Sequence, residues 1–127
     1  MTRSGSALFD ALQRLGFKRW YERQLLAGHA HLVLALLSLL ALLGSFEAMG
    51  LAQGGRAWNW AGVLASASVG FWALRRYGVL LGQAESVSLQ ATCPHCGTYG
   101  RLKCLCARPD GAEVSCRACS GAWVIQD

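Results

Sequence analysis

Cysteines are the residues of this 127-residue chain whose type and spacing could do chemistry, and all six lie between Cys93 and Cys119. Four of them form two Cys-x-x-Cys pairs, Cys93 with Cys96 and Cys116 with Cys119, with 19 residues between the pairs. A Cys-x-x-Cys turn directs two thiolates at one point, and a β-hairpin between two such turns brings four sulfurs together. The spacing therefore predicts a tetrahedral four-sulfur metal site.

The segment between the pairs has the composition of a β-hairpin. Residues 99–106 are strand-like, Pro109-Asp110-Gly111 is typical of a turn, and residues 112–115 lead back to the second pair. Trp123-Val124-Ile125 can supply a third strand. We expect residues 92–127 to form one small β-domain.

This tail resembles the zinc-ribbon family. The resemblance covers residues 91–127 and rests on the Cys-Pro-x-Cys-Gly opening turn and on a closing Cys-x-x-Cys followed by glycine and a Trp-containing strand. It implies one structural zinc ion held by Cys93, Cys96, Cys116 and Cys119. The chain departs from the family pattern where Ser120 precedes Gly121, and Cys104 and Cys106 lie outside that pattern.

A disulfide framework is the competing explanation for six cysteines, and it requires an oxidising compartment. Only 42 residues follow Glu85, a length near the lower limit for an unassisted hydrophobic core. A structural zinc contributes an apparent ~10–16 kcal/mol that is available only to the folded state. We therefore favour a metal site, with iron as the alternative to zinc.

Three further candidates for metal chemistry lie outside the four-cysteine set. Cys104 and Cys106 alternate with their neighbours, so a regular strand would place both thiols on one face as a second metal contact, a Cu(I)-type pair or a redox dithiol. We favour instead two small apolar side chains facing the interior. His95 could substitute as a ligand, but four cysteines already complete a tetrahedral site.

The rest of the chain is apolar: 54% of all residues are hydrophobic and 15% are charged, where soluble domains carry about 25% charged residues. Residues 24–46 contain no acidic or basic side chain except His29 and His31. A helix of that length spans about 34 Å, enough for a hydrocarbon core of about 30 Å. A second uncharged run, residues 57–74, precedes Arg75 and Arg76, which can extend to the lipid headgroups. The runs predict two transmembrane helices, at 25–46 and 57–81.

Basic residues predict the orientation of these helices. Five basic residues precede the first predicted span: Arg3, Arg14, Lys18, Arg19 and Arg23. Arg75 and Arg76 follow the second uncharged run, whereas the connecting segment has only Arg56. This asymmetry predicts two cytoplasmic termini in an inner or plasma membrane. Residues 7–21 have Leu8, Leu12 and Leu15 on one helical face, which predicts an amphipathic helix on the membrane surface.

The predicted fold is a membrane α-helical hairpin with an N-terminal amphipathic helix and a small C-terminal β zinc ribbon. Its expected parts are the amphipathic helix at 1–24, the hairpin at 25–85, a linker at 86–91 and the ribbon at 92–127. A stripe of small residues, Gly62, Ser66 and Gly70, predicts close packing of another helix, with the first span as the favoured partner.

No nucleophile–base pair, carboxylate pair or phosphate-binding loop is present, so we do not expect an enzyme. The sequence favours a scaffold, assembly or accessory subunit that sits in the lipid bilayer beside a membrane protein partner or a second copy of itself. A rubredoxin-like iron electron carrier and a nucleic-acid-binding ribbon are the alternatives. The tail after Glu85 carries four basic and three acidic residues, so a nucleic-acid footprint is not expected.

Overall fold

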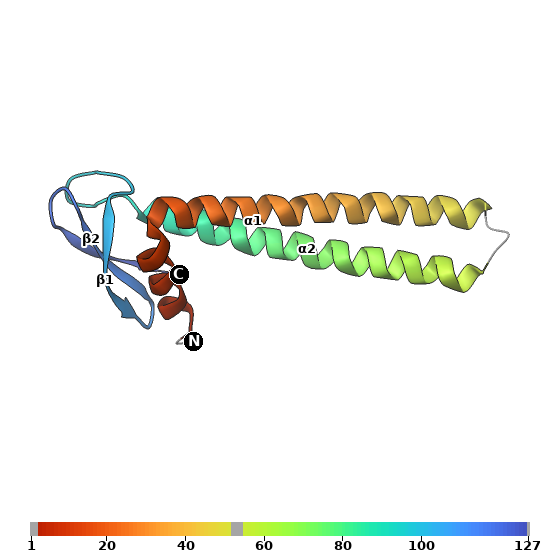
Figure 1. The fold of residues 1–127 in the computed structure, drawn as a ribbon, viewed down its shortest axis with the longest axis horizontal. Coiled ribbons are helices and arrows are strands. Elements are labelled where there is room, and N and C mark those ends of the chain that lie inside the picture. The colour runs from red at the N-terminus through yellow and green to blue at the C-terminus, as the bar shows by residue number, and fades with distance from the viewer. Residues whose placement is uncertain (1–2, 52–54, 127) are drawn as a thin grey trace. The chain divides into compact units, whose positions relative to one another are not determined.

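The computed structural model describes residues 3–51 and 55–126 (Figure 1). Two helices, α1 (Arg3–Leu51) and α2 (Arg56–Gln90), are followed by strands β1 (Leu102–Arg108), β2 (Gly111–Cys116) and β3 (Ala122–Gln126). The chain forms two compact units, which we describe separately. The ribbon unit combines Met1–Leu25 with Leu81–Asp127, and the hairpin unit contains Leu26–Leu80.

The sheet of the ribbon unit is antiparallel with the order β1-β2-β3. Residues 109–110 form the turn between β1 and β2, and residues 123–125 lie in β3, as the sequence predicts. Ala112, Val114 and Ile125 are fully buried on one face of the sheet. The expected β-domain is therefore present in the tail.

The first turns of α1 cover the buried face of the sheet, a contact that the sequence analysis did not predict. Leu8 and Leu12 lie in one hydrophobic core with Val114 and Ile125, and their side chains are 5% and 3% exposed. The apolar helical face expected at residues 7–21 exists, but it packs against protein. Placing it on the membrane surface was wrong, because the sheet offers it a complementary apolar face.

A sharp break at Gly16 lets α1 make this contact. Gly16 has φ 76° and ψ 159°, a conformation that side-chain-bearing residues rarely adopt, so the helix changes direction there (Figure 1). Phe17 and Trp20, just after the break, are 8% and 5% exposed in the same core. The segment before residue 25 is thus part of the ribbon unit.

The expected linker at 86–91 is instead the end of α2. Val87 and Ala91 are fully buried in the core. The Gln90 amide donates to the Gln126 carbonyl at 3.0 Å and accepts from the Gln126 N–H at 2.8 Å, while Trp123 Nε1 donates to the Gln90 carbonyl. These bonds fasten α2 to β3, so this segment is a packed element and not a flexible connection.

The hairpin unit pairs α1 with α2 through small residues. A methyl group added at Gly62 or Gly70 would lie 3.2 Å from Ser45 Oγ or Ser38 Cβ respectively. Ser38 is 7% exposed, and its hydroxyl donates to the Leu34 carbonyl. The small-residue stripe of α2 is therefore occupied by α1 of the same chain, as favoured from the sequence.

One helix in the described part of the chain, α1, is long and apolar enough to cross a membrane. Almost no residue of its most apolar stretch is buried within the protein. The predicted second span at 57–81 lies in α2, which does not reach the same apolarity because tryptophans, Asn59 and the Arg75-Arg76 pair interrupt its hydrophobic residues. Composition alone thus supports one span and does not confirm two.

Candidate metal centre

Two loops with the same hydrogen-bond pattern present the four cysteines. In the first, the Cys93 carbonyl accepts from the Gly97 N–H at 3.0 Å and the Cys93 N–H donates to the Thr98 carbonyl at 3.0 Å. In the second, Cys116 makes the same two bonds with Ser120, at 3.0 Å, and Gly121, at 2.8 Å. The equivalence shows that the two Cys-x-x-Cys segments are matching knuckles.

Ser120 explains why the second knuckle departs from the family pattern. Gly97 has φ 74° and Ser120 has φ 61°, so both occupy the left-handed conformation that closes the turn. From the sequence, Ser120 is expected to be interposed before the glycine of the turn. The structure shows instead that Ser120 fills the position of Gly97, and Gly121 corresponds to Thr98.

The four sulfurs lie close enough for one metal ion. Each Sγ of Cys93, Cys96, Cys116 and Cys119 is within 4.8 Å of the others. Two pairs are closer, Cys93 with Cys119 at 3.5 Å and Cys96 with Cys116 at 3.6 Å. A tetrahedron with metal–sulfur bonds of about 2.3 Å has sulfurs about 3.8 Å apart. All six cysteines are unbridged thiols, so the residues fit a four-sulfur metal centre.

Backbone N–H groups point at the sulfurs of the two buried cysteines of the cluster. Cys93 and Cys116 are each 2% exposed, and their sulfurs accept from the His95 and Ala118 N–H groups at 3.4 and 3.3 Å. Such bonds offset part of the negative charge of a metal-bound thiolate. Cys96 and Cys119 are exposed, so one edge of the centre faces solvent.

Thr98 and the neighbouring thiols set the acidity of the exposed ligands. The hydrogen bond between Cys96 and the Thr98 side chain, at 3.1 Å, lowers the pKa of Cys96 to about 6. The backbone of Gly121 lowers the pKa of Cys119, but contacts with Cys93 and Cys96 raise that pKa to about 12 overall. The two exposed thiols therefore differ in acidity, and a bound cation would replace their protons.

His95 is not part of the ligand cluster. Its ring lies against the second knuckle, where a side chain at Gly121 would collide with it. In the hairpin unit His31 Nδ1 bonds the Ala27 carbonyl at 2.7 Å, and its ring lies 5.5 Å from that of Trp72. Within the described residues, the cysteine cluster is the only group with metal-site geometry.

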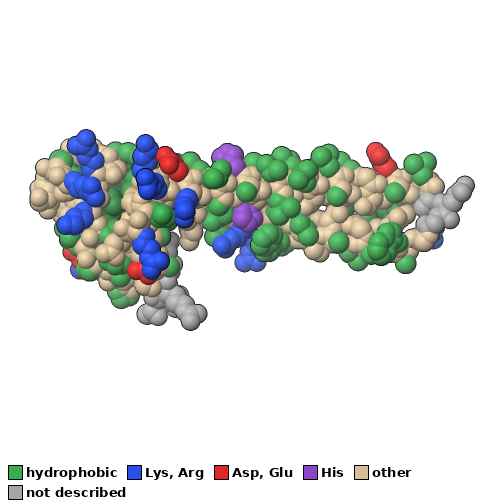
Figure 2. Space-filling view, viewed as in Figure 1, with side chains coloured by type: hydrophobic (Ala, Val, Ile, Leu, Met, Phe, Trp, Pro, Cys, Tyr) green, Lys and Arg blue, Asp and Glu red, His purple; other side chains and the backbone are tan. Residues whose placement is uncertain are grey.

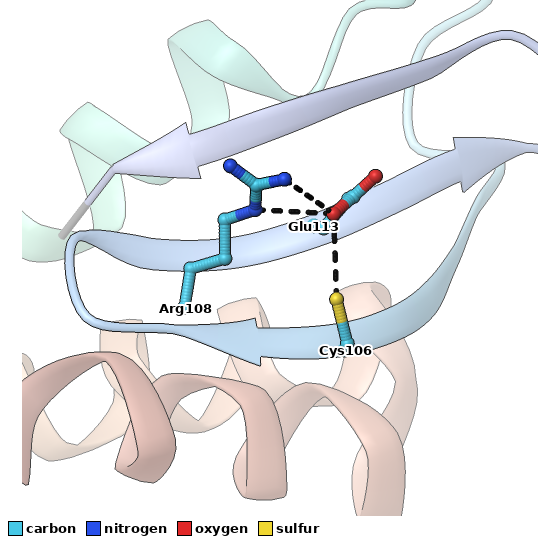
Figure 3. Close-up of polar contacts among 3 residues, drawn as sticks. All are labelled: Cys106, Arg108 and Glu113. Atoms are coloured by element: carbon cyan, nitrogen blue, oxygen red, sulfur yellow. Dashed lines mark hydrogen bonds and ion pairs between the residues drawn. The ribbon is translucent and has the colours of Figure 1, made fainter.

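A β-bulge separates the two remaining cysteines. Cys104 pairs with Val114 and Cys106 pairs with Glu113, which leaves Leu105 as the extra residue. Cys104 therefore packs against the core, while Cys106 is exposed and bonds Glu113 at 3.3 Å (Figure 3). The expectation that both thiols share one face was wrong, because the bulge reverses the alternation.

Glu113 connects Cys106 to a small polar group on the outer face of the sheet. Its carboxylate also accepts from Arg108 Nε and Nη2, each at 3.1 Å (Figure 3). The hydrogen bond that the Cys106 thiol donates to the Glu113 carboxylate raises the pKa of Cys106, and burial raises the pKa of Cys104. Neither thiol is poised as a ready nucleophile or metal ligand at neutral pH.

Comparisons with known proteins add no relative to this picture. No family model matches the chain, and neither the curated proteins nor the solved structures contain a match. The resemblance to zinc ribbons therefore rests on the paired knuckles and the four clustered sulfurs.

Proposed function

We propose that this chain is a small membrane-anchored zinc protein that serves as a scaffold or accessory subunit for a membrane protein complex. The observation that carries the proposal is the ribbon unit, in which the helical segment before residue 25 packs on the C-terminal sheet and the loops beside that sheet bring four cysteines together. An exposed apolar helix extends from the same unit.

The shared core of the ribbon unit supports a hairpin anchor. The chain leaves this unit after Leu25 and returns to it at Leu81. If α1 crosses the bilayer, the chain must cross again before Leu81, and α2 is the element available to do so. Trp58, Phe71 and Leu74 of α2 are at least 55% exposed, which suits contact with lipid or with a membrane partner.

The basic residues support a cytoplasmic location for both termini and the ribbon unit. A labelling test can check this: Gly55→Cys is introduced directly before α2 with Cys104 and Cys106 changed to alanine. A membrane-impermeant maleimide should label Gly55→Cys in intact cells. The four remaining tail cysteines, once their metal is removed, should be labelled only after lysis. Labelling of the tail in intact cells would contradict the orientation.

Zinc suits the proposed role better than iron. A four-thiolate site accepts either metal, but zinc has no redox chemistry and acts as a structural crosslink. The reducing cytoplasm keeps the thiols available for metal. Iron would make the chain a rubredoxin-like electron carrier, which the red colour and visible absorption of the purified protein would reveal.

Partner contact is the role that the ribbon surface supports best. Leu105 is pushed outward by the bulge and is 49% exposed, and Leu89 is 76% exposed. Apolar side chains displayed on a rigid small fold are a common feature of protein interfaces. The ribbon would hold this surface close to the bilayer because α2 runs into the ribbon unit without a flexible linker, and Gln90 at its end bonds Gln126 of β3.

Purification in a mild detergent tests the scaffold role. Wild-type chain should retain a stoichiometric membrane partner, and the Cys93→Ser/Cys116→Ser variant should lose it because the ribbon unfolds without metal. Leu105→Ser should weaken retention while keeping metal, and Cys104→Ser is the matched control. A wild-type chain that elutes alone, or equal retention by the metal-free variant, would contradict the proposal.

A further inference from the structure

A second candidate site lies in the ribbon unit at the break in α1. A cavity of about 550 Å³ opens between the residues around Gly16 and the start of β1. Four of the residues that line it are basic: Lys18, Arg19, Arg101 and Arg117. None of the lining residues is acidic.

The four cations come from three separate parts of the chain. Lys18 and Arg19 follow the helix break, Arg101 directly precedes β1, and Arg117 lies in the second knuckle. The Arg117 N–H donates to the Arg101 carbonyl at 2.9 Å, which holds the two arginine backbones together. Figure 2 shows Lys and Arg side chains gathered over this end of the ribbon unit.

Within the part of the chain that the structure describes, none of these four cations forms an ion pair. In residues 3–51 and 55–126 the one ion pair joins Arg108 to Glu113, and neither residue lines the cavity. Four like charges around one cavity repel each other, and this repulsion destabilises the folded state unless a counter-charge is bound. Binding of an anionic ligand therefore explains the four clustered cations better than a contribution to the stability of the fold does.

We propose that this cavity binds a phosphate group carried on an organic moiety. The planar guanidinium group of arginine matches the geometry of phosphate oxygens and makes strong charge-assisted hydrogen bonds to them. Leu15, Phe17 and Leu102 add apolar lining, which suits the organic part of the ligand. A phospholipid headgroup and a soluble organic phosphate share this chemistry. The inference is independent of the proposed scaffold role.

Calorimetry on the full-length, metal-loaded chain in a maltoside detergent tests the site. The probes are inorganic phosphate, glycerol 3-phosphate, and micelles containing phosphatidylglycerol or phosphatidylcholine. We expect saturable binding of glycerol 3-phosphate or of phosphatidylglycerol that is tighter than the binding of inorganic phosphate, because the apolar lining contacts the organic part. Equal or tighter binding of inorganic phosphate would contradict the proposal. Arg101→Gln/Arg117→Gln should weaken the binding of the organic phosphate at least tenfold, because two charge-assisted bonds are lost.

The matched control removes the same charge from the same unit. Arg14→Gln/Arg23→Gln changes two exposed arginines of α1 that do not line the cavity, and it should leave the affinity within about twofold. Binding of glycerol 3-phosphate that is tighter than binding of phosphatidylglycerol micelles would identify a soluble ligand. Binding only to phosphatidylglycerol micelles would identify a lipid. Absence of saturable binding to every probe would overturn the proposal, as would equal weakening in the control. Unchanged metal content in both variants verifies that they fold.

Discussion

Ser120 has a backbone conformation for which glycine is better suited. It has φ 61° and occupies the position that Gly97 fills in the first knuckle. The left-handed conformation costs an L-residue about 1 kcal/mol or more relative to glycine. We predict that Ser120→Gly raises the free energy of unfolding of the metal-loaded protein by about 0.5–1 kcal/mol, and that Gly97→Ser lowers it by a similar amount. Thermal melts of both variants check this, and a lower melting temperature for Ser120→Gly would contradict it.

The thiol of Cys106 is the second residue with a testable environment. Glu113 raises its pKa, whereas the positive charge of Arg108 lowers it. Less thiolate is therefore present at pH 8 than for an ordinary cysteine. We predict that Glu113→Gln moves the alkylation of Cys106 to lower pH and that Arg108→Gln moves it to higher pH.

Iodoacetamide kinetics between pH 7 and 10 measure this effect. Bound metal protects the four ligands, and Cys104→Ala removes the remaining thiol. Identical pH profiles for the wild-type and Glu113→Gln proteins would show that the carboxylate does not control Cys106.

At the scale of elements, the N-terminal helical segment of α1 is an essential part of the ribbon core. Leu12 is 3% exposed against the sheet, whereas Leu89 in α2 of the same unit is 76% exposed. We predict that Leu12→Ala lowers the free energy of unfolding by about 2–5 kcal/mol, and that Leu89→Ala changes it by less than about 0.5 kcal/mol. Chemical denaturation of the metal-loaded chain measures the free energy of unfolding of both variants. Equally small changes in Leu12→Ala and Leu89→Ala would show that the N-terminal helical segment lies outside the core.

The elements were predictable where local pattern determines them. The clustering of four cysteines, the turn at 109–110 and the third strand follow from spacing and turn chemistry within a few residues. The bulge at Leu105 has no local signature, because a regular strand and a bulged strand share the same composition, and so the opposite directions of Cys104 and Cys106 were missed. The left-handed conformation of Ser120 was not predicted because serine rarely adopts a positive φ.

At the scale of the whole molecule, the sequence concealed which segments fold together. The apolar face of residues 7–21 was visible, but the partner of an amphipathic face depends on long-range packing, which periodicity does not encode. Burial of Val87 and Ala91 likewise depends on the sheet that follows. The ribbon is therefore built from both ends of the chain, and a fragment beginning at residue 86 should not fold stably even with metal.

The metal content of the purified full-length chain tests the central claim most directly. Protein extracted from washed membranes in detergent, without added metal, is analysed for zinc and iron by mass spectrometry. The account predicts about one zinc per chain and negligible iron, loss of that zinc in Cys96→Ser, and full retention in Cys104→Ser. Stoichiometric iron, absence of bound metal, or full zinc retention in Cys96→Ser would contradict it.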